Sequence, residues 1–370
     1  MPKNPMTLPV KKYTKPIIIL VILFFIACPV QGKHLKLQFA THFNIEYIGM
    51  GCKIVTDGMG HRFFLVPRDQ KINLNGYNNI PIIRTPIKKV ATRWSTIPGF
   101  LTALDVLESL IGVTTRNEEW CALAVKKMID QGIVVNLGNP GAIDYEKLSV
   151  LDPDAFFTSP WVQTAKMMEL KIPVISITEY QEQHPLGRME WIKFFAAFYN
   201  KEKEADLFFE KAVKHIHKLS KKLKKSKKQP KILWGFIRTS GMVYAPGKNS
   251  YVSKMISLLQ GISPLNESCL IQNMPVSLEL FYQQGKNTEI YIYPASLYQE
   301  GIKTINQLVA TTPIIKNFKS IKKGNVWCLQ PWYWESVHRT DQIMEDLAAI
   351  FHPKLFPHHS FRYFMKLPQK

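Results

Sequence analysis

Apolar and polar side chains alternate over residues 34–67, on both sides of the stretch DGMG at 57–60. A period of two places one face of a strand on a core, and an Asp-Gly pair between two such runs is typical of a hairpin turn. We therefore predict an N-terminal β-hairpin extension over residues 33–85.

The pattern changes at residue 86 into short apolar runs that alternate with helical patterns. The first series predicts strands at 87–95, 111–115, 133–138 and 172–177, with helices at 96–110, 118–132 and 161–171 between them. A second series predicts strands at 231–237, 241–246 and 324–331 and helices at 250–261 and 304–318. Strands that alternate with helices at this spacing predict βαβ units and mostly parallel sheets.

One unit occurs in both series, at 143–160 and at 276–294. Each copy reads as a capped short helix followed by a strand that ends at a proline. The capping residue, Asp144 or Ser277, stands two positions before a glutamate, Glu146 or Glu279. A carboxylate in the first turn is stabilised by the helix N-terminus, so this pairing can be purely local.

The longest helical pattern runs over residues 184–228 and shows one apolar stripe, formed by Phe208, Ala212, Ile216, Leu219 and Leu223. It separates an N-terminal α/β lobe at 86–183 from a C-terminal α/β lobe at 229–329. A C-terminal helix and tail follow at 330–370. The predicted fold class is α/β: two Rossmann-like lobes with mostly parallel sheets, joined by one long α-helix and preceded by the β-hairpin.

Residues 1–32 have the pattern of a secretory signal. Four lysines precede a twelve-residue apolar run at 16–27, which is shorter than the ~20 residues of a membrane helix. We therefore expect export to the periplasm or the outer face of the cell membrane. Lipidation of Cys28 and ordinary cleavage after Gly32 remain alternatives, and an uncleaved anchor is a third.

The net charge limits the classes of partner that we expect, and the cysteine spacing limits the bonds that the cysteines can form. The formal net charge is +20, and residues 214–231 are rich in lysine without an acidic residue. No aromatic residues interleave with these lysines, so we expect no nucleic acid partner; a basic surface suits an anionic ligand or membrane. The cysteines outside the leader, Cys52, Cys121, Cys269 and Cys328, show no C-x-x-C spacing, which favours buried free thiols, although export permits a disulfide.

Enzymatic motifs are scarce. The sequence has no G-x-S-x-G, no phosphate-binding G-x-x-x-x-G-K-[ST] loop, no H-E-x-x-H and no G-x-G-x-x-G after a strand. No three histidines stand at metal-ligand spacing. We therefore predict no catalytic residues and no resident metal or cofactor, and keep a secreted α/β hydrolase and a bare-metal binder as alternatives. We also expect a monomer.

Candidate ligand-binding residues lie in loops that follow strands, because ligands of open α/β sheets bind at the carboxyl ends of the strands. Arginine and aromatic side chains there suit a large, planar or anionic ligand. The candidates are Trp94, Arg116, Trp120, Trp161, Arg188, Tyr244, Tyr251, Trp332 and Trp334.

Three stretches carry a family resemblance: IGVTT at 111–115, IDYEKLSVLDPDAFF at 143–157, and IKKGNVWCL at 321–329, which a helix ending in HPKLF follows. With them, the chain from Pro86 to Phe356 resembles the periplasmic binding proteins that serve ABC importers of ferric siderophores, haem and cobalamin. The resemblance implies capture of an iron complex between two lobes and delivery to an ABC permease with its ATPase. Haem, cobalamin or a bare metal ion are alternative cargoes, and a signalling receptor is an alternative recipient.

The resemblance also implies a docking role for the repeated glutamates. In such proteins each lobe presents a surface glutamate to arginines of the permease. The matching positions in the resembling passages are Glu146 in the first lobe and Glu279 in the second. The ligand-contacting residues of this family vary widely, so the resemblance does not identify the cargo.

Overall fold

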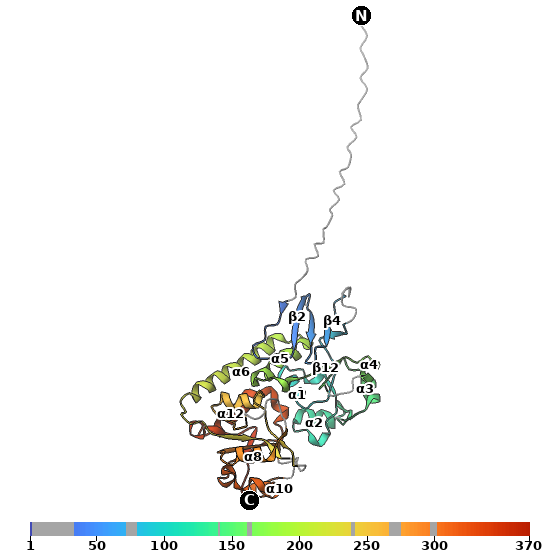
Figure 1. The fold of residues 1–370 in the computed structure, drawn as a ribbon. Helices are drawn as coiled ribbons and strands as arrows, with labels where there is room; N and C mark the ends of the chain where they lie inside the picture. The colour runs from blue at the N-terminus through green and yellow to red at the C-terminus, as the bar shows by residue number, and fades with distance from the viewer. Residues whose placement is uncertain are drawn as a thin grey trace. The chain divides into compact units, whose positions relative to one another are not determined.

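The computed structural model describes residues 1, 33–71, 80–139, 141–160, 165–237, 241–265, 275–296 and 302–370. The chain divides into two compact units, 1–31 and 32–370. Nearly all of the first unit, including Cys28, lies outside the described residues. The second unit contains the extension and both lobes (Figure 1).

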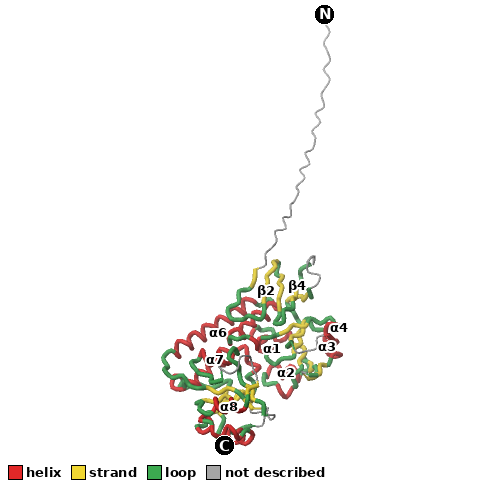
Figure 2. Tube along the Cα trace, viewed as in Figure 1, coloured by secondary structure: helices red, strands yellow, loops and turns green. Residues whose placement is uncertain are grey.

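The extension forms a five-stranded sheet in the order β1-β2-β3-β4-β5. The strands are β1 (Lys33–His34), β2 (Asn44–Gly49), β3 (Cys52–Thr56), β4 (Arg62–Pro67) and β5 (Ile82–Thr85). The predicted hairpin is present as β3 and β4, and Asp57 stabilises its turn by accepting hydrogen bonds from the N–H groups of Met59 and His61 (both 2.9 Å). The hairpin is nevertheless only the centre of a larger sheet, in which β5 pairs parallel with β4. Figure 2 shows these strands as a group around β2 and β4.

Two buried carboxylates bind the extension to the end of the first lobe and to the segment that follows it. Glu190 accepts hydrogen bonds from the backbone N–H groups of residues 38–40 at 2.8–3.0 Å. Glu182 accepts hydrogen bonds from the N–H groups of residues 41 and 42 at 3.0–3.1 Å. A buried charge needs such partners, so the segment 38–42 and the two glutamates are fixed together.

The first lobe has a fully parallel sheet in the order β12-β11-β6-β7-β8. Its strands are β6 (Val90–Thr92), β7 (Leu110–Val113), β8 (Val135–Asn136), β11 (Ala155–Thr158) and β12 (Val174–Ser176). Its helices are α1 (Ile97–Ala103), α2 (Leu123–Asp130), α3 (Tyr145–Leu151) and α4 (Ala165–Glu169), and a short ribbon pairs β9 (Gly138–Asn139) with β10 (Ala142–Ile143). The predicted α/β class with mostly parallel sheets is confirmed.

The segment between the lobes differs from the prediction of a single helix. It contains α5 (Pro185–Tyr199) and α6 (Glu202–Leu223), separated at Asn200, which adopts a left-handed conformation with φ of 57°. Every residue of α5 is buried, whereas α6 buries only one apolar face. Asparagine tolerates the left-handed conformation that ends a helix, so the chain turns here and α6 packs back on α5 (Figure 1).

The second lobe has the sheet order β13-β17-β18-β19. β13 (Ile232–Trp234), β17 (Ile290–Ser296) and β18 (Val326–Leu329) are parallel, and β19 (Phe364–Lys366) adds an antiparallel edge. A second, antiparallel sheet joins β14 (Phe236–Ile237), β15 (Val243–Tyr244) and β16 (Pro275–Val276). The helices are α7 (Tyr251–Leu258), α8 (Leu278–Gly285), α10 (Ile305–Thr311), α11 (Lys319–Lys322) and α12 (Thr340–Phe351), with a 3₁₀ segment η5 (Trp334–Arg339) before α12.

The repeated unit is present in both lobes, as α3 with β11 and as α8 with β17. Asp144 accepts a hydrogen bond from Lys147 N (3.0 Å), and Ser277 accepts one from Leu280 N (3.1 Å), so both predicted caps form. In the second copy the strand continues past Pro294 to Ser296, with a shift in register between Tyr293 and Ser296. Proline donates no hydrogen bond, which explains an irregularity at this point of the ladder.

Two further expectations concern cysteines and membrane helices. Cys52 and Cys121 are free thiols, Cys328 is buried in β18, and Cys269 lies outside the described residues. No helix in the part of the chain that the structure describes combines the length and apolar character needed to span a membrane.

Candidate ligand-binding site

Polar side chains meet at the carboxyl edge of the first-lobe sheet. Arg93 directly follows β6, and its Nη1 donates a hydrogen bond to Oγ of Ser159, which follows β11 (3.2 Å). Thr114, which follows β7, donates from Oγ1 to the carbonyl oxygen of Arg93 (3.4 Å). Because parallel strands end at the same edge, three connections far apart in the sequence converge around Arg93.

The charge of Arg93 is not neutralised by any carboxylate that the structure describes. Its side chain is partly buried, its Nε has no hydrogen-bond partner among those residues, and desolvation lowers its pKa. The buried hydroxyl of Thr158, at the end of β11, also lacks a partner there. An arginine stays protonated even with a lowered pKa, so this edge presents a cation and free polar atoms to a ligand.

Exposed tryptophans lie at the same end of both lobes. Of the seven tryptophans that the structure describes, Trp94, Trp332 and Trp334 are 37%, 41% and 40% exposed. Trp94 follows β6, whereas Trp332 and Trp334 follow β18. The helix α1, which begins three residues after Trp94, packs against η5, which begins at Trp334. The exposed indoles therefore flank the junction of the two lobes.

A buried glutamate connects the lobes at this junction. Glu335 of η5 is 8% exposed and accepts hydrogen bonds from the N–H groups of Cys121 (2.8 Å) and Ala122 (2.5 Å). Ala122 is the N-cap of α2 and has no side chain able to cap it. The second lobe thus supplies the cap of a helix in the first lobe, and burial raises the pKa of Glu335.

A second interlobe contact uses two residues that the sequence nominated for ligand binding. The guanidinium of Arg188 in α5 lies 4.1 Å from the ring centre of Tyr251 in α7, and its Nη2 lies 3.4 Å from Oε1 of Glu179. Arg188 is only 3% exposed. In this arrangement both nominated side chains serve packing between the lobes, and their contact with a ligand stays a prediction.

The other nominated residues lie in different surroundings. Trp120 is 3% exposed in the core and its Nε1 donates to the carbonyl of Thr115 (3.3 Å), so it has a packing role in this structure. Arg116 is exposed near the carboxyl edge of the first-lobe sheet, and its charge is paired with that of Glu119 (3.1 Å). The ring of Tyr244 stacks on Phe236 with centroids 5.6 Å apart. Trp161 lies outside the described residues.

Arg93 is not among the candidates selected from the sequence, which include its neighbour Trp94 instead. The signal for Arg93 was available, because a single arginine directly after a buried strand has its side chain at the carboxyl edge. The sequence does not show, however, that the charge of Arg93 lacks a carboxylate partner, because that depends on where the surrounding carboxylates lie in the folded chain.

The repeated glutamates are both on the surface. Glu146 and Glu279 are exposed at the second position of α3 and α8. Glu279 accepts a hydrogen bond from Gln283 one turn later (3.1 Å). Among the described residues, no three His, Cys, Asp or Glu side chains group as they would around a metal ion.

Comparison with known proteins decides the family. The model of the periplasmic binding protein family matches residues 90–332. The chain belongs to the periplasmic binding protein family. Two uncharacterized lipoproteins of Methanocaldococcus jannaschii are 29% and 30% identical to this binding protein, over 91% and 83% of its chain and 87% and 80% of theirs.

A solved structure agrees with the two-lobe fold. A periplasmic haem-binding protein of Vibrio cholerae matches this binding protein with a TM-score of 0.56 and 16% identity, over 70% of this chain and 98% of that one. This binding protein therefore works outside the cytoplasm, in the periplasm or at the outer face of the membrane.

Proposed function

We propose that this binding protein captures an anionic iron complex, of the ferric siderophore kind, at the lobe junction and delivers it to an ABC permease. Arg93 is the observation that carries the proposal. A partly buried guanidinium without a carboxylate partner among the described residues favours a ligand that brings negatively charged oxygen atoms.

The exposed aromatic side chains further restrict the chemical class of the ligand. Trp94, Trp332 and Trp334 offer flat, partly exposed indoles on both lobes. Planar rings stack on such surfaces, and an anionic complex pairs with Arg93. A ferric catecholate combines aromatic rings with negative charge in one molecule, so it matches both features of the site. In this proposal the protein binds and releases its cargo, performs no reaction and holds no resident cofactor.

Haem is the second candidate, because it is a planar iron complex with two carboxylates and one solved relative binds it. Cobalamin would use the stacking surfaces but needs no guanidinium. A bare zinc or manganese ion suits the site less, since Arg93 would repel a cation. A secreted hydrolase would need a nucleophile beside a base near Arg93, and Ser159 there is hydrogen-bonded to the arginine instead.

Tryptophan-fluorescence titration of the mature protein tests the cargo. The ligands are a ferric catecholate, a ferric hydroxamate, haem, cobalamin and free iron, zinc and manganese ions. We expect saturable quenching by the anionic iron complexes, and we expect Arg93→Gln to weaken it at least about thirtyfold, as loss of a buried charge partner costs ~2 kcal/mol or more. Arg62→Gln, an exposed arginine in the extension, is the matched control and should bind normally. Quenching by free ions alone, or equal affinity of both variants, would contradict the proposal.

Docking to the permease is proposed for Glu146 and Glu279, because both are exposed at equivalent places in the two lobes. The double variant Glu146→Lys with Glu279→Lys should keep ligand affinity and lose uptake in cells. Glu210→Lys in α6 is the control for charge reversal and should retain uptake. Normal uptake by the double variant would refute the assignment.

A further inference from the structure

The amino edge of the second-lobe sheet lies at the end of the fold opposite the extension. β13, β17 and β18 are parallel, so the segments that precede them lie side by side at this edge. β19 is antiparallel to β18 and therefore ends at the same edge, and Figure 1 shows the C-terminus, which follows β19, far from β2 and β4. The opposite edge leads to Trp332 and Trp334 at the lobe junction. The amino edge therefore points away from the proposed cargo site.

Lysines from three segments are brought together at this edge. Lys319 N donates a hydrogen bond to the carbonyl oxygen of Lys286 (2.9 Å), and Glu289 N donates one to that of Lys231 (2.9 Å). The side chain of Asn325, before β18, donates to the carbonyl oxygen of Glu289 (2.9 Å). The backbone therefore holds the three segments within hydrogen-bond distance of one another. We call the basic edge the six exposed lysines that they carry: Lys228, Lys231, Lys286, Lys319, Lys322 and Lys323.

The positive charge of the basic edge is largely unpaired. Glu289 is the one carboxylate within the segments 228–231, 286–289 and 319–323, so six lysines face one glutamate. Lys228 Nζ lies 2.9 Å from Oε2 of Glu289, and the five other lysines form no ion pair with a described residue. Burial acts to raise the pKa of Glu289, but the hydrogen bond and charge of Lys228, together with the charge of Lys319, hold it below its usual value. Lysines from different segments thus act on the same carboxylate.

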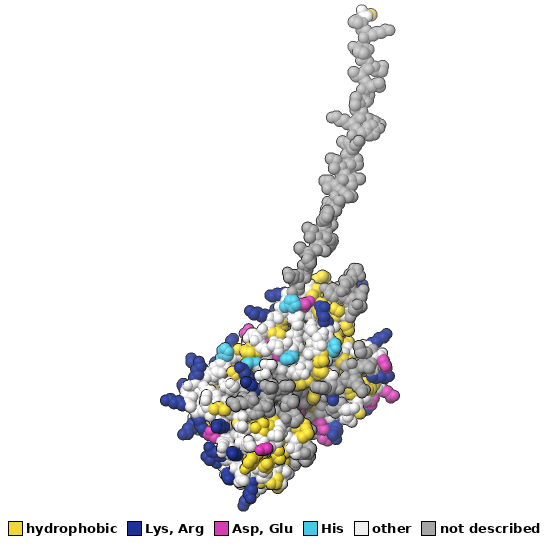
Figure 3. Space-filling view, in the orientation of Figure 1, with side chains coloured by type: hydrophobic (Ala, Val, Ile, Leu, Met, Phe, Trp, Pro, Cys, Tyr) yellow, Lys and Arg dark blue, Asp and Glu magenta, His cyan; other side chains and the backbone are white. Residues whose placement is uncertain are grey.

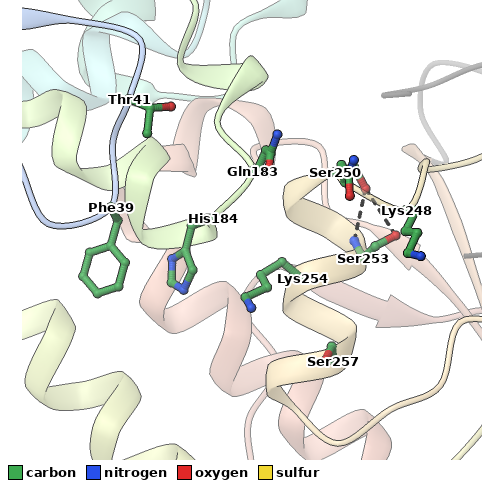
Figure 4. A pocket seen from close by; sticks show the side chains of 10 residues that line it. Phe39, Thr41, Gln183, His184, Lys248, Ser250, Ser253, Lys254 and Ser257 are labelled. Carbon is green, nitrogen blue, oxygen red and sulfur yellow. Dashed lines mark hydrogen bonds between the residues drawn. The ribbon is translucent and has the colours of Figure 1, made fainter. Parts of the chain in front are cut away.

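The basic edge differs from two other places that carry lysines. Figure 3 shows Lys and Arg side chains projecting from several parts of the surface. In a cavity lined by His184 and by residues of α7, Figure 4 shows Lys248 and Lys254 directed away from each other. On α6, Lys214 is paired with Glu210 (3.7 Å). The basic edge is therefore distinguished by the convergence of separate segments rather than by the number of its lysines.

The side chains of the basic edge favour a hydrophilic polyanion as partner. The three described segments expose no large apolar side chain, whereas aromatic and other large side chains anchor protein interfaces, and apolar ones anchor amphipathic membrane contacts. Lysine is a point charge on a flexible stem, which suits spaced charges along a polymer, whereas arginine suits a single planar anion. Lys286 follows the end of α8, and Glu279, proposed for permease docking, lies at its start. A permease at Glu279 therefore leaves the basic edge uncovered.

We propose that the basic edge binds an acidic polysaccharide outside the cytoplasm. Carboxylates on successive sugars pair with lysines from all three segments at once, and the attraction acts over about 10 Å at moderate salt. The polymer holds the second lobe by its amino edge and leaves the lobe junction open. The proposal therefore does not depend on which cargo binds there.

Biolayer interferometry of the mature protein on immobilised polygalacturonate, a polymer with a carboxylate on each sugar, tests the basic edge, and neutral dextran is the blank. We expect saturable binding that weakens as sodium chloride is raised. The edge variant combines Lys231→Gln, Lys286→Gln, Lys319→Gln and Lys322→Gln. The control variant loses the same charge from exposed lysines of α6, through Lys211→Gln, Lys214→Gln, Lys218→Gln and Lys221→Gln. The edge variant should bind at least about tenfold more weakly than the wild type, because several modest charge pairs are lost together, and the control should stay within about twofold.

Urea denaturation should give both variants the free energy of unfolding of the wild type, because the replaced side chains are exposed. Equal losses of binding in the two variants would overturn the proposal, because they would show attraction by net charge alone. Unchanged binding of the edge variant, or no saturable binding by the wild type, would also refute it. Tighter binding to phosphatidylglycerol vesicles than to polygalacturonate, lost in the edge variant, would make a membrane the partner and exclude the polysaccharide.

Discussion

Replacing Glu335 by alanine tests how the lobes are held together. In the structure its carboxylate accepts two backbone hydrogen bonds from the first lobe, and α2 has no other side-chain cap. The variant removes the acceptor, so two backbone N–H groups lose their hydrogen-bond partner at a junction that excludes most solvent. We therefore expect both loss of stability and loosening between α1 and η5.

The magnitude follows from these two contacts. A buried donor left without a partner costs ~1–3 kcal/mol, and loss of an N-cap costs ~0.5–2 kcal/mol. The two descriptions count the same N–H groups, so they are not added. We expect Glu335→Ala to lower the free energy of unfolding by about 2–4 kcal/mol, the sum for two unpaired donors after partial solvation.

Urea denaturation measures the free energy of unfolding, and hydrogen exchange locates the change. Protection should fall at Cys121 and Ala122, and also in α1 and η5, because the lobes separate more often. Asp144→Ala is the matched control: it removes a cap that α3 receives from its own segment, so its effect should stay within the first lobe. Exchange in Glu335→Ala that changes only near Cys121 would refute the interlobe role.

Two other variants test the contact between α1 and η5 and the pH dependence of stability. In Gly99→Ala the new Cβ would lie 2.5 Å from the carbonyl oxygen of Glu335 and closer still to His338, so α1 and η5 must shift apart. Urea denaturation should show a lower free energy of unfolding, and an unchanged value would contradict this. His215 pairs with Asp341 (2.8 Å), and this hydrogen bond raises the pKa of His215 above its usual value of 6.5. Because the folded state holds this proton more tightly, the contribution to stability is complete below pH 6.5 and is lost as pH rises through the folded pKa. His215→Gln should flatten this part of the stability profile, and an unchanged slope would exclude the pair as its source.

The sequence predicts the elements of the lobes well because their patterns are local. Asp144 and Ser277 are recognisable caps, and the apolar runs at β6, β7 and β18 are short and bounded. The break at Asn200 was missed, because residues 184–228 form an uninterrupted helical pattern and only the packing of α6 on α5 requires a turn there. The edge strand β19 was missed for a related reason: three residues of tail become a strand only beside β18.

The site is less predictable, because burial and charge pairing are properties of the assembled fold. Trp120 and Trp94 both stand in loops after strands, yet one ring lies in the core and the other is exposed. Arg188 was selected from the sequence and Arg93 was not, yet Glu179 lies beside Arg188, whereas no described carboxylate lies beside Arg93. Loop position therefore selects residues near the carboxyl edge of the sheet, whereas their burial and charge pairing depend on tertiary structure.

The carboxylates of Glu182 and Glu190 also determine which part of the fold bears a force applied at the N-terminal end of the extension. They bind residues 38–42 to the start of α5, so a pull on Lys33 is transmitted to the first lobe within a few residues. The second lobe is attached to this anchored region through α5, α6 and the contacts at the junction. A molecule held at Lys33 is therefore held directly at the end of its first lobe and at α5, and its second lobe bears the pull through those connections.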